Sequence, residues 1–145
     1  MSVMFTVHGQ PKGKDRPRFT KQGRTYTSDA TKQYESEIKA AYLSKGVKGK
    51  FDAGTPVKME IVAFYGIPKN DKKDIKEKKK SGEILPTIKS DIDNVCKIFA
   101  DALNGLAYDD DKQITHLVAA KRYDENPRVI VRISEVKEND GSGNG

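Results

Sequence analysis

The feature that most constrains the fold is an alternation of side chains between residues 57 and 65. Val57, Met59, Ile61, Ala63 and Tyr65 occupy every second position. Side chains spaced by two share one face of an extended strand, so this segment predicts a strand with one buried face. Only 35% of the residues are hydrophobic and 33% are charged. We therefore expect a small core beneath a heavily charged surface.

Other segments supply the partners of this strand. Strand patterns cover residues 3–8, 114–123 and 128–136, and the turn-forming run DENP joins the last two, which predicts an antiparallel hairpin. Apolar residues at helical spacing predict a helix over 29–45, with Ser28 as its N-cap and Gly46 at its end. A second helix is expected to begin at a cap formed by Asp93 or Asn94 and to run to about Asn104, before Gly105.

The order β-α-β-α-β-β predicts a single-domain α/β (α+β) fold in which a mixed sheet packs against two helices. The chain has 145 residues, which suits one domain. We place that domain at residues 1–136. Residues 137–145 are polar and rich in glycine, so we expect a disordered tail.

Several classes of protein do not fit this sequence. No apolar run reaches the ~18–20 residues that a membrane span needs, and the N-terminal residues do not resemble a secretory signal. Cys96 is the only cysteine, so an intramolecular disulfide is excluded, and the histidines His8 and His116 are too far apart to suggest a zinc site. We expect a cytoplasmic protein without a membrane partner.

Positive charge is concentrated in two segments. The net charge is +6, yet residues 10–25 carry +5 and residues 69–80 carry +4, so the remaining chain is acidic. Two basic segments in an otherwise acidic chain are typical of a surface that binds a polyanion such as DNA, although charged runs are often only solvated loops. Residues 69–82 fit either a loop or a short exposed helix. The candidate DNA-binding residues are Lys12, Lys14, Arg16, Arg18, Lys72, Lys73, Lys76, Lys78, Lys79 and Lys80.

Acidic residues are concentrated between residues 89 and 113. Asp93, Lys97 and Asp101 are four residues apart and line one helical face, and the triplet at 109–111 follows after Gly105. A reversal there can bring the triplet back toward Asp91 and Asp93. Clustered carboxylates repel one another unless a cation lies between them, and Mg²⁺ prefers carboxylate oxygens. The simpler interpretation is a helix cap, a surface ion-pair ladder and a turn.

The runs DIDNVCKIFADAL and AYDDDKQI resemble the signature of the RusA family of Holliday-junction resolvases. The order of the elements is also similar from residue 3 to about residue 136. The matching positions are Asp91, Asp93, Asn94, Lys97, Asp101, Ala102, Leu103, Asp110, Asp111, Gln113 and Ile114.

The resemblance implies a homodimer that binds four-way DNA junctions and cuts them with Mg²⁺, for which Mn²⁺ is a substitute, and without an organic cofactor. It implies that Asp91, Asp93 and Asp111 bind the metal, with Asp110 as a further candidate. Lys97 is implied as the catalytic lysine, whose fixed charge suits the negative charge of the transition state.

Other functions remain open at this stage. One alternative is a less selective nuclease for flaps or replication forks, which the sequence does not separate from a junction resolvase. A second is a non-catalytic DNA-binding protein on the same scaffold, and a third is a basic domain that binds a partner protein. The intact acidic set and Lys97 favour an enzyme over the last two.

Overall fold

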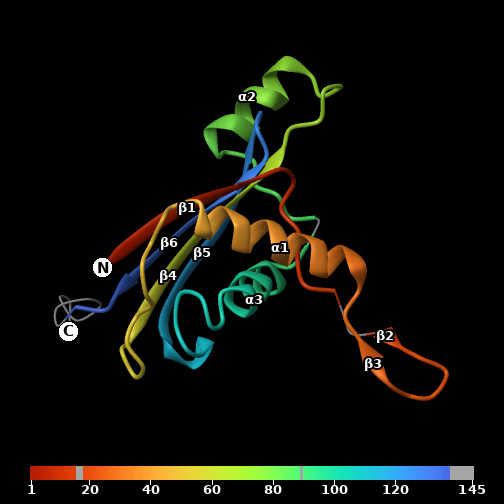
Figure 1. The fold of residues 1–145 in the computed structure, drawn as a ribbon. Coiled ribbons are helices and arrows are strands. Elements are labelled where there is room, and N and C mark those ends of the chain that lie inside the picture. The colour runs from red at the N-terminus through yellow and green to blue at the C-terminus, as the bar shows by residue number, and fades with distance from the viewer. Residues whose placement is uncertain (16–17, 89, 138–145) are drawn as a thin grey trace.

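A four-stranded mixed sheet forms the centre of the molecule (Figure 1). The computed structural model describes residues 1–15, 18–88 and 90–137. The strands lie in the order β1-β6-β4-β5. Their bounds are Ser2–His8 for β1, Val57–Gly66 for β4, Ile114–Asp124 for β5 and Arg128–Glu135 for β6.

The strand pairing differs from the predicted hairpin. β6 is antiparallel to both β1 and β4, whereas β5 is parallel to β4 and forms an edge of the sheet. The prediction that the last two strands pair with each other was therefore wrong. The DENP run does turn the chain, but β4 occupies the place between β5 and β6. The predicted alternation of β4 is confirmed, because the five side chains assigned to its buried face are all buried.

Two helices cover one face of the sheet, as predicted. α1 (Asp29–Leu43) begins at Ser28, whose hydroxyl accepts a hydrogen bond from the N–H of Thr31. α3 (Ile92–Ala102) begins at Asp91, so the predicted cap at Asp93 or Asn94 was wrong. Ile92 packs against the core and joins the first turn, which moves the cap to the residue before it.

The core lies between these helices and the sheet. The apolar stripe of α3 is buried, and the ring of Phe99 meets that of Tyr34 on α1 edge-on, with 5.9 Å between ring centroids. Cys96 belongs to this core and is 6% exposed, as expected of a small apolar residue. The opposite side of α3 is therefore left to polar residues.

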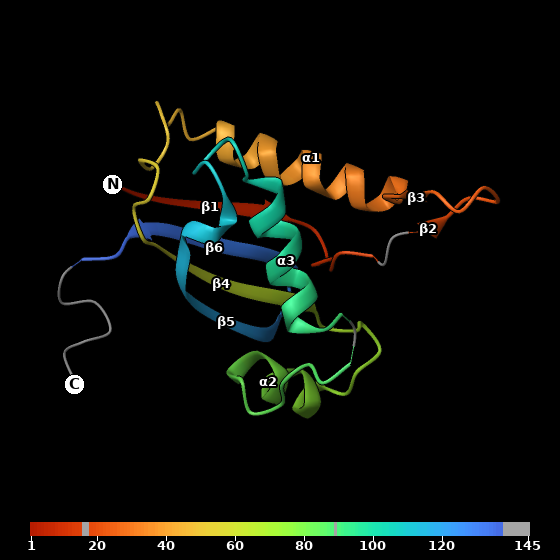
Figure 2. The ribbon, with the colours of Figure 1, turned by 90° about the horizontal axis from the view of Figure 1, so that it is seen from below.

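Two projections extend from this body (Figure 2). α2 (Lys73–Ser81) follows β4, so the basic segment is a short helix rather than a loop. The strands β2 (Arg18–Phe19) and β3 (Thr25–Tyr26) form a separate two-stranded sheet before α1. In the described parts of the chain, no helix is long and apolar enough to cross a membrane.

Candidate active site

The polar side of α3 carries the residues that the sequence singled out. Asp93, Lys97 and Asp101 stand on successive turns, opposite the buried stripe. Asp93 and Lys97 are exposed, whereas Asp101 is half-buried. The ion-pair ladder of the simpler interpretation does not form, because none of the ion pairs among the described residues joins these three side chains to each other.

The N-terminal end of α3 holds two carboxylates that form no ion pair with another described residue. Asp91 has the extended backbone of an N-cap, but its side chain makes no capping hydrogen bond. Asp91, Asp93 and Lys97 take part in no ion pair with another described residue. Two exposed carboxylates and one exposed ammonium thus lie close together on the first two turns.

The C-terminal end of α3 is more crowded. The Nζ atom of Lys14 donates a short hydrogen bond to the carboxylate of Asp101. Partial burial and the adjoining carboxyls of Asp110 and Asp101 raise the pKa of Asp111. The pKa of Asp110 is lowered, chiefly because its side chain accepts a hydrogen bond from the N–H of Lys112. Three carboxylates therefore meet here, with a cation from the N-terminal segment at one side.

Asn104 and Gln113 hold the acidic triplet in place. Gly105 adopts a φ of 81°, which favours glycine and allows the chain to reverse after α3. The N–H of Asp111 then donates to Oδ1 of Asn104 at 2.7 Å. The Gln113 side chain accepts from the N–H of Asp109 at 3.0 Å and donates to the carbonyl of Asp52 at 2.9 Å. Gln113 belongs to the motif that resembles the RusA signature, but these positioning roles join distant residues and were not predicted from the sequence.

The reversal returns the triplet to a different place from the one predicted. Asp111 meets Asp101, whereas Asp91 and Asp93 lie at the other end of α3, about 12–15 Å away along the helix axis. Within the described residues, no three His, Cys, Asp or Glu side chains form a ready-made metal site. The carboxylates suit Mg²⁺ in their chemistry, but one chain does not gather Asp91, Asp93 and Asp111. Their role as a ligand set stays a prediction.

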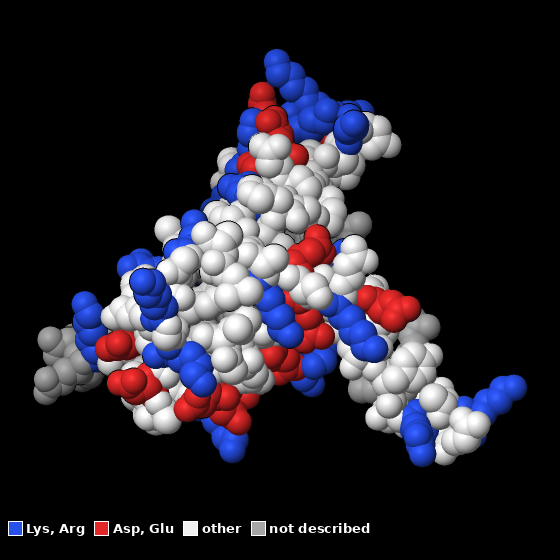
Figure 3. Space-filling view, viewed as in Figure 1, with Lys and Arg blue, Asp and Glu red and all other residues white. Residues whose placement is uncertain are grey.

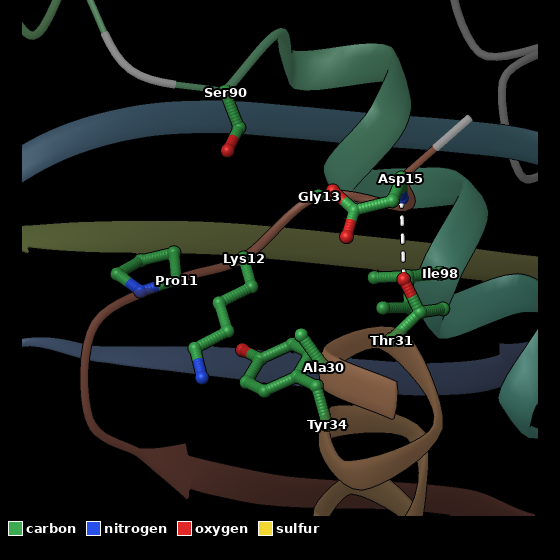
Figure 4. Close-up of a pocket in the computed structure, with 9 residues that line it drawn as sticks. All are labelled: Pro11, Lys12, Gly13, Asp15, Ala30, Thr31, Tyr34, Ser90 and Ile98. Atoms are coloured by element: carbon green, nitrogen blue, oxygen red, sulfur yellow. Dashed lines mark hydrogen bonds between the residues drawn. The ribbon is translucent and has the colours of Figure 1, made fainter. Parts of the chain in front are cut away.

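The N-terminal basic segment crosses α3 at close range. The N–H of Lys14 donates to the carbonyl of Asn94 at 3.1 Å. A Cβ atom on Gly13 would lie 3.0 Å from Cβ of Asn94, so glycine permits this approach. Lys12 and Ser90, the residue before Asp91, line one cavity of about 220 Å³ beside α1 (Figure 4). The segment therefore places Lys14 beside Asp101 near the C-terminal end of α3, whereas the ammonium of Lys12 lies over the Tyr34 ring, 5.8 Å from its centroid.

The candidate DNA-binding residues fall into two groups. Lys14, Lys79 and Lys80 pair with Asp101, Asp71 and Glu125, respectively. The end of the molecule that α2 forms carries many basic side chains, and acidic side chains lie both between this end and the hairpin and along the lower side of the molecule (Figure 3). Arg16 and the side chain of Arg18 lie outside the described residues. Four candidate lysines of α2 and its N-cap form no ion pair with a described residue: Lys72, Lys73, Lys76 and Lys78.

Comparison with known proteins identifies the family. The sequence profile described as "Endodeoxyribonuclease RusA" matches residues 8–134. The chain belongs to the RusA family. It is 36% identical over 137 residues to the uncharacterized protein YqaN of Bacillus subtilis strain 168, covering 92% of this chain and 96% of YqaN. It is 32% identical over 112 residues to the crossover junction endodeoxyribonuclease rusA of Lactococcus phage r1t, covering 77% of each chain.

Membership of the RusA family settles the class of reaction. The chain is an endodeoxyribonuclease with the α+β fold of this family, and the resemblance inferred from its acidic motif is confirmed. The motif spans α3 and the start of β5, within the matched range. The polar side of α3 is therefore the candidate active site of a RusA nuclease.

Proposed function

We propose that this RusA protein is a Mg²⁺-dependent resolvase that cuts four-way DNA junctions as a homodimer, in recombination and repair. The observation that carries the proposal is the family motif, placed on the exposed polar side of α3 between two basic projections. The phage relative named as a crossover junction endodeoxyribonuclease supports the choice of substrate. The compartment we propose is the cytoplasm of a bacterium or of a phage-infected cell.

The chain's own residues have distinct parts in this proposal. Asp91, Asp93 and Asp111 are the proposed metal ligands, with Asp110 as a further candidate; Mn²⁺ is expected to replace Mg²⁺. A bound Mg²⁺ lowers the pKa of a water molecule and neutralises phosphate charge. Lys97 stands one turn after Asp93 with its ammonium unpaired, so it is available to stabilise negative charge that develops on the phosphate.

The free edge of β5 supports a homodimer. Residues 114–120, ITHLVAA, contain no charged residue and no proline, the usual protections of an edge strand. Leu117 and Val118 are each 53% exposed. Within the described parts of the chain, residues 116–120 form backbone pairs with β4 alone. The other edge strand, β1, has α1 packed beside it (Figure 2). We therefore propose that two β5 strands pair antiparallel about a twofold axis.

This pairing also accounts for the divided acidic set. Asp111 lies three residues before β5. Lys121, near the other end of β5, donates to the carbonyls of Ile88 and Ser90, just before Asp91. Antiparallel strands place the start of one beside the end of the other. Two paired copies would thus bring Asp111 of the partner subunit toward Asp91 and Asp93. A metal site shared by two chains is consistent with the incomplete set in one chain.

The experiment is a cleavage assay with a synthetic four-way junction, a flap and a linear duplex, each with Mg²⁺ and with excess chelator. We expect paired nicks in the junction that depend on Mg²⁺, and little cutting of the duplex. Equal cutting of flap and junction would favour the less selective nuclease. Binding without cutting under all metal conditions would favour a DNA-binding protein on the same scaffold.

Sedimentation velocity tests the proposed interface separately. Replacing Leu117 and Val118 with Lys places like charges on both copies of the free edge, so we expect a monomer. Met4→Lys is the matched control, because Met4 is 58% exposed on the opposite edge strand. A monomeric Met4→Lys variant, or a dimeric Leu117→Lys/Val118→Lys variant, would contradict pairing through β5.

A further inference from the structure

The hairpin formed by β2 and β3 is fixed at its base by the N-terminus of α1. The hydroxyl of Ser28 donates to the carboxylate of Asp15 at 2.9 Å, and the N–H of Asp15 donates to Oγ1 of Thr31 at 3.3 Å. Asp15 thus ties the incoming strand of the hairpin to the first turn of α1. Because α1 packs on the core, the direction in which the hairpin projects is set by the body of the protein.

The tip of the hairpin is also well defined. The N–H of Thr20 donates to the carbonyl of Arg24 at 2.7 Å, and the N–H of Gly23 donates to the carbonyl of Thr20 at 2.9 Å. In a third hydrogen bond of this turn, the N–H of Arg24 donates to Oγ1 of Thr20 at 3.1 Å. Gly23 has a φ of 79°, as a tight turn at this position requires. The hairpin is therefore a short, closed projection.

This projection carries the exposed aromatic side chains of the protein. The sequence has six tyrosines, five phenylalanines and no tryptophan. In the described parts of the chain, the exposed ones are Phe19, at 72%, and Tyr26, at 47%. Phe19 pairs with Thr25 and Tyr26 with Arg18, so the two rings lie on opposite faces of the hairpin. Exposed Lys21 and Arg24 stand at its tip.

We propose that Phe19 and Tyr26 stack on nucleobases at the branch point of a DNA junction, while Lys21 and Arg24 contact the neighbouring phosphates. This inference rests on the proposed function and assigns the residues that select a branched substrate. Aromatic rings combined with cations are the usual means of binding unstacked bases. A protein or membrane partner is less consistent with the hairpin, because each face offers a single ring, with Lys21 and Arg24 at the tip, rather than a continuous apolar patch.

The geometry of DNA explains why such a hairpin selects branched substrates. In a continuous duplex, each base pair is covered on both faces by its neighbours, so an aromatic ring has no free surface to stack on. At a branch point, stacking is interrupted and base faces become accessible. A hairpin with one ring on each face suits the gap between two helical arms. Charge alone binds junction and duplex phosphates alike.

The test measures binding of a four-way junction and of a linear duplex of equal length, with chelator present so that no cutting occurs. We expect Phe19→Ala to weaken junction binding about tenfold, the effect of losing one stacked base, and to leave duplex binding nearly unchanged. Phe19→Trp should restore junction binding and Phe19→Leu should not, because a ring is required. Leu43→Ala is the control, since Leu43 is 59% exposed at the far end of α1.

A fluorescent base analogue, 2-aminopurine, placed at the branch point gives a direct readout. We expect the parent protein to change its emission and Phe19→Ala to lose that change, with unaltered thermal unfolding of the variant. Equal weakening on junction and duplex, or rescue by Phe19→Leu, would overturn the proposal. If the parent binds junctions through Phe19 but never cuts them, the proposed function fails while this inference stands.

Discussion

The two ends of α3 differ in how their carboxylates are neutralised. At the C-terminal end, Asp101 forms an ion pair with Lys14. Asp111 lies close to Asp101, and its pKa is raised by partial burial and by the neighbouring carboxyls. At the N-terminal end, Asp91 and Asp93 form no ion pair with another described residue. The first arrangement pairs its charge inside the protein, whereas the second leaves two exposed carboxylates available to an external cation. Aspartate thus forms an internal ion pair at Asp101, whereas we propose that Asp91 and Asp93 bind metal together with Asp111 of the partner subunit.

The largest effect is expected from Asp93→Asn. Losing one ligand should lower the cleavage rate at least about 100-fold, or about 2.7 kcal/mol. Junction binding should stay equal or become tighter, because a negative charge near phosphate is removed. Asp109→Asn is the matched control, since Asp109 is exposed and pairs with Lys50. The cleavage rates of both variants are measured under single-turnover conditions in Mg²⁺. If Asp93→Asn cuts at nearly the rate of the parent, the carboxylates at the N-terminal end of α3 do not have the catalytic role proposed for them.

Lys97 and Lys14 provide the next comparison. Lys97→Ala should slow cleavage about 100-fold, as for the loss of one transition-state donor, without altering thermal unfolding. Lys14→Ala should instead lower stability by roughly 1 kcal/mol, because the half-buried Asp101 loses its partner. Lys14→Ala should slow cleavage less than Lys97→Ala does. Thermal unfolding and cleavage rates are measured for both variants. A large loss of stability in Lys97→Ala, together with a large loss of cleavage in Lys14→Ala, would contradict these assignments.

The lysines of α2 test the same distinction between paired and unpaired charges. Replacing Lys72, Lys73, Lys76 and Lys78 with Ala should flatten the slope of log affinity against log salt by about 3–4, if each one neutralises a phosphate. Lys79→Ala should change the slope little, since Lys79 contacts Asp71 and lies 4.8 Å from the Tyr123 ring centroid. Salt titrations of junction binding measure both slopes. Equal slopes for the parent and the fourfold variant would place α2 away from DNA.

Local patterns predicted the elements better than their pairing. The alternation of β4, the apolar stripe of α3 and the cap at Ser28 each depend on neighbours within one turn or one strand, so the sequence reveals them. The position of β5 beside β4 depends on the whole sheet, and DENP indicates only that the chain turns. The acidic residues were visible, but the ion pair between Lys14 and Asp101 joins residues 87 positions apart. The sequence therefore predicted a site on α3 without its division into two ends.

The smallest effect concerns stability at the C-terminal end of α3. Because the pKa of Asp111 is raised in the folded protein, its ionised form disfavours folding, and stability should increase as the pH falls through that pKa. Asp111→Asn should remove this repulsion and raise stability at neutral pH, in chelator, by roughly 0.2–1 kcal/mol. Asp109→Asn removes the ion pair with Lys50, so it should not raise the stability. If Asp111 also binds Mg²⁺, adding the metal should raise the melting temperature of the parent more than that of Asp111→Asn. A lower melting temperature of Asp111→Asn in chelator would mean that this carboxylate stabilises the fold, and that the two ends of α3 differ less than the structure indicates.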